Sequence, residues 1–223
     1  MDLKKLLFFI EIPDGSDVKY EVDEETGMLM ADRFLYTSMG YPANYGYVMG
    51  TKGKDGDPVD VLVLASKKVN AGVGIKGHVI GMLEMEDEEG IDHKLIAVPD
   101  KKVDPIFGVW EDLKDVPQQS LDRIKHFFEH YKELEPGKWI KVHKFQDRTH
   151  AEKEIEESAM KYEQECEMCS ADGCSHDCDD CKGAGCCDKC EKCTDGQCEC
   201  SAGHAGGSCG GHCHCGDSHI PSK

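Results

Sequence analysis

The segment DGDPVD at residues 55–60 places three carboxylates within six positions, directly before the apolar run VLVLA. Like charges a few ångströms apart repel by roughly 1 kcal/mol in water and by several times that near a protein surface. A solvated turn is one interpretation, since Asp-Gly and Asp-Pro favour turns. A calcium loop is a second, although the spacing departs from the EF-hand pattern and no distal glutamate follows. A magnesium site is a third, because a divalent ion relieves the repulsion between hard carboxylate oxygens.

A second acidic group, EMEDEEGIDHK, occupies residues 84–94 between two apolar segments. We therefore expect a hairpin loop at one end of a sheet. Glu84, Glu86 and Glu89 are interpreted as solvated residues of that loop.

Several polar residues interrupt segments that otherwise read as strands. Glu11 lies between two isoleucines, Arg33 precedes Phe34, and Lys19 and Glu21 alternate with apolar neighbours. Side chains two positions apart share one face of a strand, so Lys19 and Glu21 face the same way. That face is either solvent or a binding site. The tyrosines of YPANYGY (41–47), expected on a loop, either pack or offer hydroxyl groups.

The elements that would position these residues are mainly short Val- and Ile-rich strands. Spacing and Gly/Asp turns predict a mostly antiparallel β-barrel. The expected strands are 6–12, two within 19–35 around a turn at 24–27, 59–65, 73–85, 93–99 and 139–145.

Two helices are expected to follow. Ser120 is the predicted N-cap of the first, which has a predicted apolar side and ends at Pro136-Gly137. That side consists of Leu121, Ile124, Phe127, Phe128, Tyr131 and Leu134. Thr149 and Glu152 predict a capping box for the second helix, which runs to about residue 165.

Composition narrows the classes of partner. The formal net charge is −18, which disfavours nucleic acid, because a phosphate-backbone binder needs a basic face. The apolar stretch at residues 6–10 is shorter than a signal peptide requires, and no segment approaches the ~20 apolar residues of a membrane span. We expect a cytoplasmic protein that has no membrane partner.

Cysteine usage divides the chain into two parts. All 14 cysteines lie between Cys166 and Cys215, in a segment without Leu, Val, Phe, Tyr or Trp. Such a segment cannot bury enough apolar surface to offset its ordering entropy. We therefore expect a globular domain at residues 1–163 and a Cys/Gly/His-rich tail at 164–223.

The tail is a candidate site for soft metals. Thiolates at gaps of one or two residues can converge on Zn²⁺ or Cu⁺, and the composition resembles that of metallothioneins. A redox-labile disordered tail is the alternative, and the absence of a signal segment argues against structural disulfides. The candidate ligands are Cys166, Cys169, Cys178, Cys181, Cys187, Cys190, Cys193, Cys198, Cys200, Cys213 and Cys215.

Eight motifs follow one another over roughly residues 8–160 of the globular part. They are IEIP (10–13), KYE (19–21), DRF (32–34), YPANYGY (41–47), DGDPVD (55–60), EDEEGIDHK (86–94), VP (98–99) and HFFEHYKELEPGKW (126–139). In their order and spacing they resemble family I soluble inorganic pyrophosphatases, which makes residues 1–163 the expected catalytic domain. The resemblance implies an OB-like barrel flanked by two helices, several Mg²⁺ ions and hydrolysis of inorganic diphosphate to two phosphates. It also implies a homo-oligomer, a hexamer of two trimers.

The same resemblance implies a role for each matching residue. Asp57 corresponds to the carboxylate that takes a proton from the attacking water. The implied metal ligands are Asp55, Asp60 and Asp92, with Asp60 bridging, followed by Asp87 and Glu11, with Glu21 and Glu88 in support. The implied phosphate-binding residues are Lys19, Arg33, Tyr45, Lys94, Tyr131 and Lys132. These residue types suit the reaction, since divalent ions acidify water and cations neutralise phosphate charge.

A function of another class stays open at this point. The chain could be a catalytically silent, pyrophosphatase-like scaffold whose main role is metal binding by the tail. The intact set of site residues favours the enzyme.

Overall fold

The computed structural model describes residues 2–23, 25–54, 56–171, 193–194 and 197–198. The chain divides into two compact units, one of Met1–Val22 with Met28–Tyr162 and another of Asp23–Gly27 with Glu163–Lys223. The second unit contains a short antiparallel pair, β10 (Cys193–Thr194) and β11 (Gln197–Cys198). The functional division at residue 163 stays a prediction. Among the described residues, no helix is long and apolar enough to cross a membrane.

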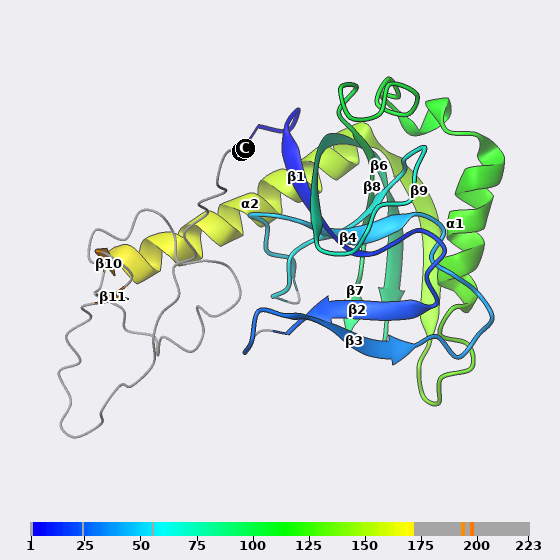
Figure 1. The fold of residues 1–223 in the computed structure, drawn as a ribbon, viewed down its shortest axis with the longest axis horizontal. Coiled ribbons are helices and arrows are strands. Elements are labelled where there is room, and N and C mark those ends of the chain that lie inside the picture. The colour runs from blue at the N-terminus through cyan, green and yellow to red at the C-terminus, as the bar shows by residue number, and fades with distance from the viewer. Residues whose placement is uncertain (1, 24, 55, 172–192, 195–196, 199–223) are drawn as a thin grey trace, which may run out of the picture. The chain divides into compact units, whose positions relative to one another are not determined.

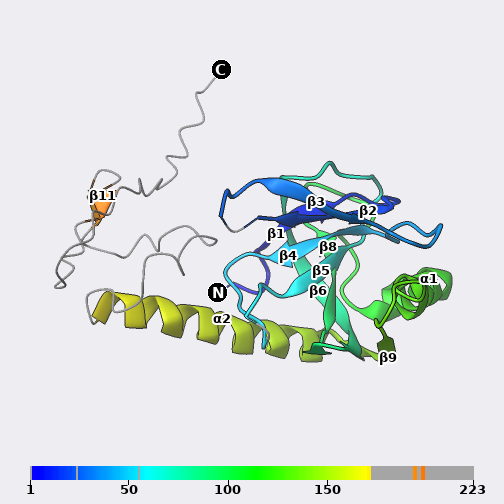
Figure 2. The same cartoon turned by 90° about the horizontal axis from the view of Figure 1, so that it is seen from below.

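Five strands of the first unit close into a barrel (Figures 1 and 2). The ring closes because β1 pairs with both β4 and β6. Neighbouring strands are antiparallel except for the parallel pair β5–β8. In ring order the strands are β1 (Leu6–Ile12), β4 (Asn44–Val48), β5 (Asp60–Val63), β8 (Lys94–Pro99) and β6 (Val73–Asp87). This arrangement confirms the predicted OB-like, mainly β fold.

The remaining strands of the first unit extend this ring. β9 (Ile140–Asp147) pairs with β6, and β7 (Gly90–Ile91) forms a tight hairpin with the end of β6. β2 (Val18–Val22) and β3 (Leu29–Phe34) form a separate antiparallel hairpin beside β1.

Buried side chains form two clusters that share the central strands. Along β5, Val61 and Val63 belong to one cluster and Leu62 to the other, since successive side chains point to opposite faces. Both faces are covered, which explains the uninterrupted apolar run after DGDPVD. The cluster around Leu62 packs against α1 (Gln118–His130), and the other packs against α2 (Arg148–Ala171).

The predicted helix caps were wrong. α1 begins directly after Pro117, whose carbonyl accepts the Ser120 N–H at 2.8 Å, so Ser120 lies inside the first turn. α2 begins at Arg148, ahead of Thr149, and the Asp147 carboxylate accepts the His150 N–H at 3.2 Å. An aspartate preceding the first turn satisfies a free backbone donor as well as a threonine does.

The ends of the helices also differ from the prediction. α1 ends at His130 rather than at Pro136-Gly137, and a turn follows in which Leu134 is exposed. α2 continues to Ala171, beyond the expected end.

Two predicted loops are largely strand. The second half of YPANYGY forms β4 in the barrel wall, and Gly46 allows β1 to approach there: a Cβ at this position would lie 1.8 Å from the Phe9 carbonyl oxygen. β6 runs on to Asp87, so most of the first half of EMEDEEGIDHK is also paired backbone. Alternation of polar and apolar residues there follows the pleat of a strand.

Asp104 holds together the loop that follows β8. The buried carboxylate accepts N–H groups from Ser66 at 2.6 Å, Ile106 at 2.9 Å and Phe107 at 3.1 Å. Burial opposes ionisation, but these hydrogen bonds outweigh it and lower the pKa of Asp104. The carboxylate therefore stabilises the fold above its ordinary pKa of about 3.9, and this stabilisation is lost as the pH falls further.

Asp104→Ala is expected to lower the free energy of unfolding by about 2–3 kcal/mol at neutral pH, because buried donors lose a charged acceptor. Urea unfolding followed by circular dichroism measures this change. Asp122→Ala, on the exposed face of α1, is the control and should stay within about 0.5 kcal/mol. Equal stability of the two variants would contradict the role of Asp104.

Candidate active site

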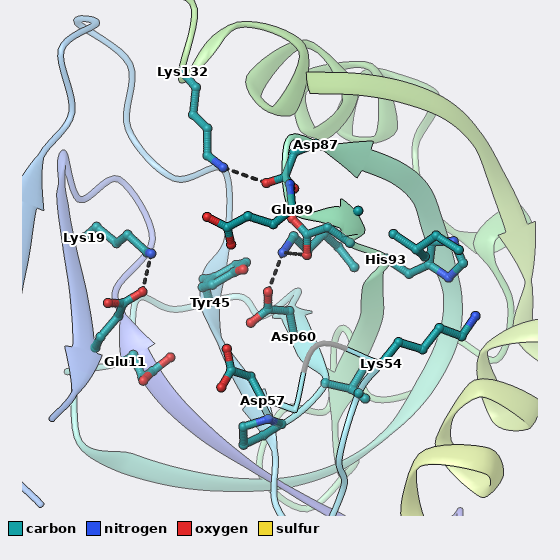
Figure 3. Close-up of a pocket in the computed structure, with 18 of the residues that line it drawn as sticks. Glu11, Lys19, Tyr45, Lys54, Asp57, Asp60, Asp87, Glu89, His93 and Lys132 are labelled. Atoms are coloured by element: carbon teal, nitrogen blue, oxygen red, sulfur yellow. Dashed lines mark hydrogen bonds and ion pairs between the residues drawn. The ribbon is translucent and has the colours of Figure 1, made fainter. Parts of the chain in front are cut away.

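A cavity of about 210 Å³ opens between the β2–β3 hairpin, the barrel and the turn after α1. Twelve of the residues implied by the resemblance line it, from segments far apart in the sequence. They are Glu11, Lys19, Glu21, Arg33, Tyr45, Asp57, Asp60, Asp87, Asp92, Lys94, Tyr131 and Lys132. Figure 3 shows the carboxylates of Glu11, Asp57 and Asp60 turned toward a common space beside Tyr45.

Asp57 lies on a loop between β4 and β5 that its own backbone stabilises. The Gly53 N–H donates to the Asp57 carbonyl at 2.6 Å, and the buried Thr51 hydroxyl joins Val48 to Val59. Gly56 adopts φ of +104°, a conformation that favours glycine. The turn thus delivers the Asp57 carboxylate to the cavity; Asp55 lies outside the described residues.

Lys94 lies between two carboxylates because of the parallel pairing of β5 and β8. Val61 pairs with Leu95, which places Asp60 and Lys94 side by side at the starts of the two strands. The buried Lys94 ammonium group contacts the carboxylates of both Asp60 and Asp92. Burial alone would lower the pKa of Lys94, but these two charges raise it above its ordinary value, so the group stays charged.

Burial and like charge raise the pKa of two cavity carboxyl groups. Burial is the main cause at Glu11, whose pKa rises to about 7, and the charge of Asp60 adds to it. Burial also raises the pKa of Asp92, and Asp60 again adds to it although Lys94 opposes the shift. Both shifts favour the neutral acid, and in each the charge of Asp60 adds to the effect of burial.

A β-bulge directs Glu11 toward this cavity. The register of β1 against β4 shifts between Ile10 and Ile12, so Glu11 has no partner of its own. Bulges reorient side chains in this way. Glu11 Oε1 then accepts the Val22 N–H at 3.2 Å, which fixes the carboxylate against β2. On the same strand, Lys19 contacts Glu21, so the two side chains share a face as predicted.

A second group of ion pairs lies at the end of β6. Lys132 Nζ donates to Asp87 Oδ2 at 2.8 Å, as Figure 3 shows. Burial opposes ionisation of Asp87, but this bond and the Glu89 N–H lower its pKa. Glu88 does not line the cavity: its carboxylate contacts Lys138 and lies 4.0 Å from Lys132 Nζ.

Tyr45 and Tyr131 bring uncharged hydroxyl groups to the cavity. Burial, with nearby carboxylates adding to it, raises the pKa of Tyr45 and Tyr131 well above their ordinary value. Tyr131 follows α1 directly, and its ring stacks on Phe127 with centroids 4.9 Å apart. The packing of α1 therefore fixes where the Tyr131 hydroxyl and the adjacent Lys132 reach.

Sequence reasoning missed several cavity residues. Tyr41 belongs to YPANYGY and Glu89 and His93 to EDEEGIDHK, so their motifs were a usable signal. Glu89, interpreted as a solvated residue, reaches the rim of the cavity. Tyr20 likewise belongs to KYE, whereas Lys54 and Glu154 lie outside every motif.

The donor chemistry of the cavity fits a hard divalent cation. Its acidic residues offer oxygen ligands, which Mg²⁺ prefers, and a cation would relieve the repulsion that Asp60 exerts on Glu11 and Asp92. Among the described residues no three His, Cys, Asp or Glu side chains already converge as a metal cage. Lys94 instead contacts both Asp60 and Asp92.

Comparison with known proteins decides the family. The sequence model described as inorganic pyrophosphatase matches residues 8–163. The chain belongs to the inorganic pyrophosphatase family. Curated inorganic pyrophosphatases are similar to this chain: that of Aquifex pyrophilus is 52% identical over 153 residues, covering 69% of this chain and 86% of the relative. That of Helicobacter pylori is 49% identical over 162 residues, covering 73% and 94%.

Solved structures of the inorganic pyrophosphatase family share the fold. The enzyme from Helicobacter pylori superposes with a TM-score of 0.71 at 49% identity, covering 73% of this chain and 95% of that chain. The protein from Coxiella burnetii gives 0.70 at 46% identity, covering 73% and 97%. The matched region of the chain is thus a nearly full-length inorganic pyrophosphatase domain, and the Cys-rich tail lies outside the family match.

Proposed function

We propose that this protein hydrolyses inorganic diphosphate to two phosphates in a reaction that depends on Mg²⁺. The observation that carries the proposal is one cavity in which carboxylates and cationic side chains from segments far apart in the sequence meet. The family match and the identity to curated pyrophosphatases support the same conclusion.

Each group has a proposed task. Glu11, Asp55, Asp60, Asp87 and Asp92 would hold magnesium ions, with Glu21 and Glu88 in support. The ions, when bound, would supply acidity to a water molecule and positive charge to phosphate oxygens. Asp57 accepts the proton of the attacking water, since a carboxylate that reaches the cavity can act as a general base.

The cationic and phenolic residues bind the substrate. Arg33 offers a planar fork of N–H donors to phosphate oxygens, whereas Lys19, Lys94 and Lys132 act as point charges. Tyr45 and Tyr131 donate hydrogen bonds without adding charge, because their raised pKa values keep them protonated.

Phosphate release from diphosphate, with and without Mg²⁺, tests the proposal on the full chain and on a variant truncated after Glu165. Release that requires Mg²⁺ in both proteins supports it. Absence of release from a folded, magnesium-loaded protein would favour the silent scaffold instead.

We also propose that the protein is a hexamer, which sedimentation of the same samples tests. We further propose that it is cytoplasmic, which fractionation of cells tests.

We propose a separate role for the Cys-rich tail, the binding of Zn²⁺ or Cu⁺. The candidate cysteines lie where the structure describes no side chains, so the proposal rests on the sequence alone. Its support is the density of thiols at gaps of one or two residues, which suits soft ions and not Mg²⁺.

Purified full-length protein is expected to carry Zn or Cu, and truncation after Glu165, which removes all 14 cysteines, should abolish this content. Elemental analysis measures it, with thiol titration alongside. Full-length protein with free thiols and only Mg²⁺ would overturn the role of the tail while leaving the hydrolase proposal untouched.

A further inference from the structure

Arg33 forms an ion pair with Glu135, a residue that does not line the cavity. Its guanidinium Nη1 lies 3.5 Å from Glu135 Oε2, and its Nε lies 3.9 Å from Asp32 Oδ2. The Glu135 side chain is 9% exposed and that of Arg33 26%. The more buried partner is therefore the acid, which anchors the more accessible cation.

The turn after α1 explains how Glu135 reaches this place. The Glu135 N–H donates to the Lys132 carbonyl at 2.9 Å, which closes a turn around residues 132–135. The preceding residues Tyr131 and Lys132 line the cavity. One short segment thus contributes two side chains to the site and a third that contacts Arg33.

The pair is incompletely satisfied. Among the described residues, Arg33 Nε and Glu135 Oε1 are buried atoms without a hydrogen-bond partner. A bidentate arginine–carboxylate pair would use two parallel hydrogen bonds, and this pair makes a single contact at 3.5 Å. Since Glu135 contacts Nη1, other N–H donors of the guanidinium stay available to an anion in the cavity.

Restraint of Arg33 matters because the cavity offers it competing acids. Glu11, Glu21, Asp57 and Asp60 line the same space, and an unrestrained guanidinium would pair with one of them. The contact with the Glu135 carboxylate keeps the Arg33 guanidinium away from these cavity acids. On this basis, and resting on the proposed function, we propose that Glu135 is a positioning residue that holds Arg33 ready for a phosphate group of diphosphate.

The test is a double-mutant cycle between Glu135→Ala and Arg33→Ala. Glu135→Ala is expected to raise KM for diphosphate about tenfold, as loss of one charge-assisted contact would do. It should weaken binding of the unhydrolysed analogue methylenediphosphonate to the same extent. In the Arg33→Ala background the same substitution should change either quantity less than about twofold, because Glu135 acts through Arg33.

Matched variants separate positioning from general stability. Glu135→Gln keeps an acceptor oxygen and should stay within about threefold of the wild type. Glu133→Ala removes an exposed acid from the same turn and should change nothing. Thermal unfolding monitors the fold, and Glu135→Met, which keeps the volume without an acceptor, replaces the alanine variant where that variant does not fold.

Equal losses in both backgrounds, or no loss in the folded Glu135→Ala or Glu135→Met protein, would overturn the positioning role. These outcomes differ from failure of the proposed function, in which the wild type itself releases no phosphate. In that case calorimetric binding of methylenediphosphonate still compares wild type with the Glu135 variants.

Discussion

Asp57→Asn is expected to lower the rate of phosphate release about 1,000-fold while leaving the fold intact. An amide cannot accept a proton at neutral pH, and general-base groups contribute roughly 10²–10⁴-fold. The substitution is nearly isosteric, and hydrogen bonds of the backbone and of Thr51 support the shape of the loop. The loss should appear in kcat, since a proton acceptor acts on the transition state.

Fixed-time assays of phosphate release at saturating Mg²⁺ measure this effect, and circular dichroism verifies the fold. Glu89→Gln is the matched control: it makes the same carboxylate-to-amide change at the rim of the cavity, where the side chain is 78% exposed. Its expected effect is a few-fold at most. Phosphate release from Asp57→Asn at the wild-type rate would remove Asp57 from its proposed task.

The fold was predictable where local patterns decide it. Val61 to Leu64 and Leu95 to Val98 are apolar without interruption, and strands buried on both faces give this pattern. A closed barrel could be predicted as a fold class, but the strand pair that closes it could not. The pairing of β1 with β6 joins residues far apart in the sequence. The parallel pairing of β5 with β8 left no local signal.

The site was predictable through its motifs more than through its geometry. Alternation placed Lys19 and Glu21 on one face, and the structure agrees. The bulge at Glu11 was not predictable, since a register shift depends on both paired strands. The contact of Glu135 with Arg33 was not predictable for a related reason. An acidic residue in a turn normally faces solvent, and only tertiary contacts bring it to Arg33.

Lys94 shows how strongly such tertiary contacts matter. Lys94 lies between a polar and an apolar residue, as many exposed lysines do. It is nevertheless only 3% exposed and contacts two carboxylates. Its raised pKa keeps it charged at every pH below its ordinary value of about 10.4, so its stabilising contribution is complete at neutral pH. Removal of this charge leaves Asp60 and Asp92 facing each other.

Lys94→Met is expected to lower the free energy of unfolding of the metal-free protein by about 2–4 kcal/mol. Breaking a buried ion pair costs 3–5 kcal/mol, and the partial exposure of Asp60 and Asp92 reduces that figure. The loss should shrink on acidification toward pH 4, because the pKa of Asp92 is already raised and its protonation removes the repulsion. Urea unfolding across this pH range measures the change.

Magnesium should reverse much of this destabilisation even though hydrolysis stays slow. A ligand at 100 times its dissociation constant stabilises a fold by about 2.7 kcal/mol, and two unpaired carboxylates should hold the cation more tightly than a pair shared with Lys94. Phosphate release should still fall about 100-fold, since a preorganised charge next to the substrate is missing. Lys141→Met removes an exposed lysine paired with Glu86 and should change neither quantity appreciably. If magnesium stabilised wild type and Lys94→Met equally, Lys94 would not compete with the cation for Asp60 and Asp92.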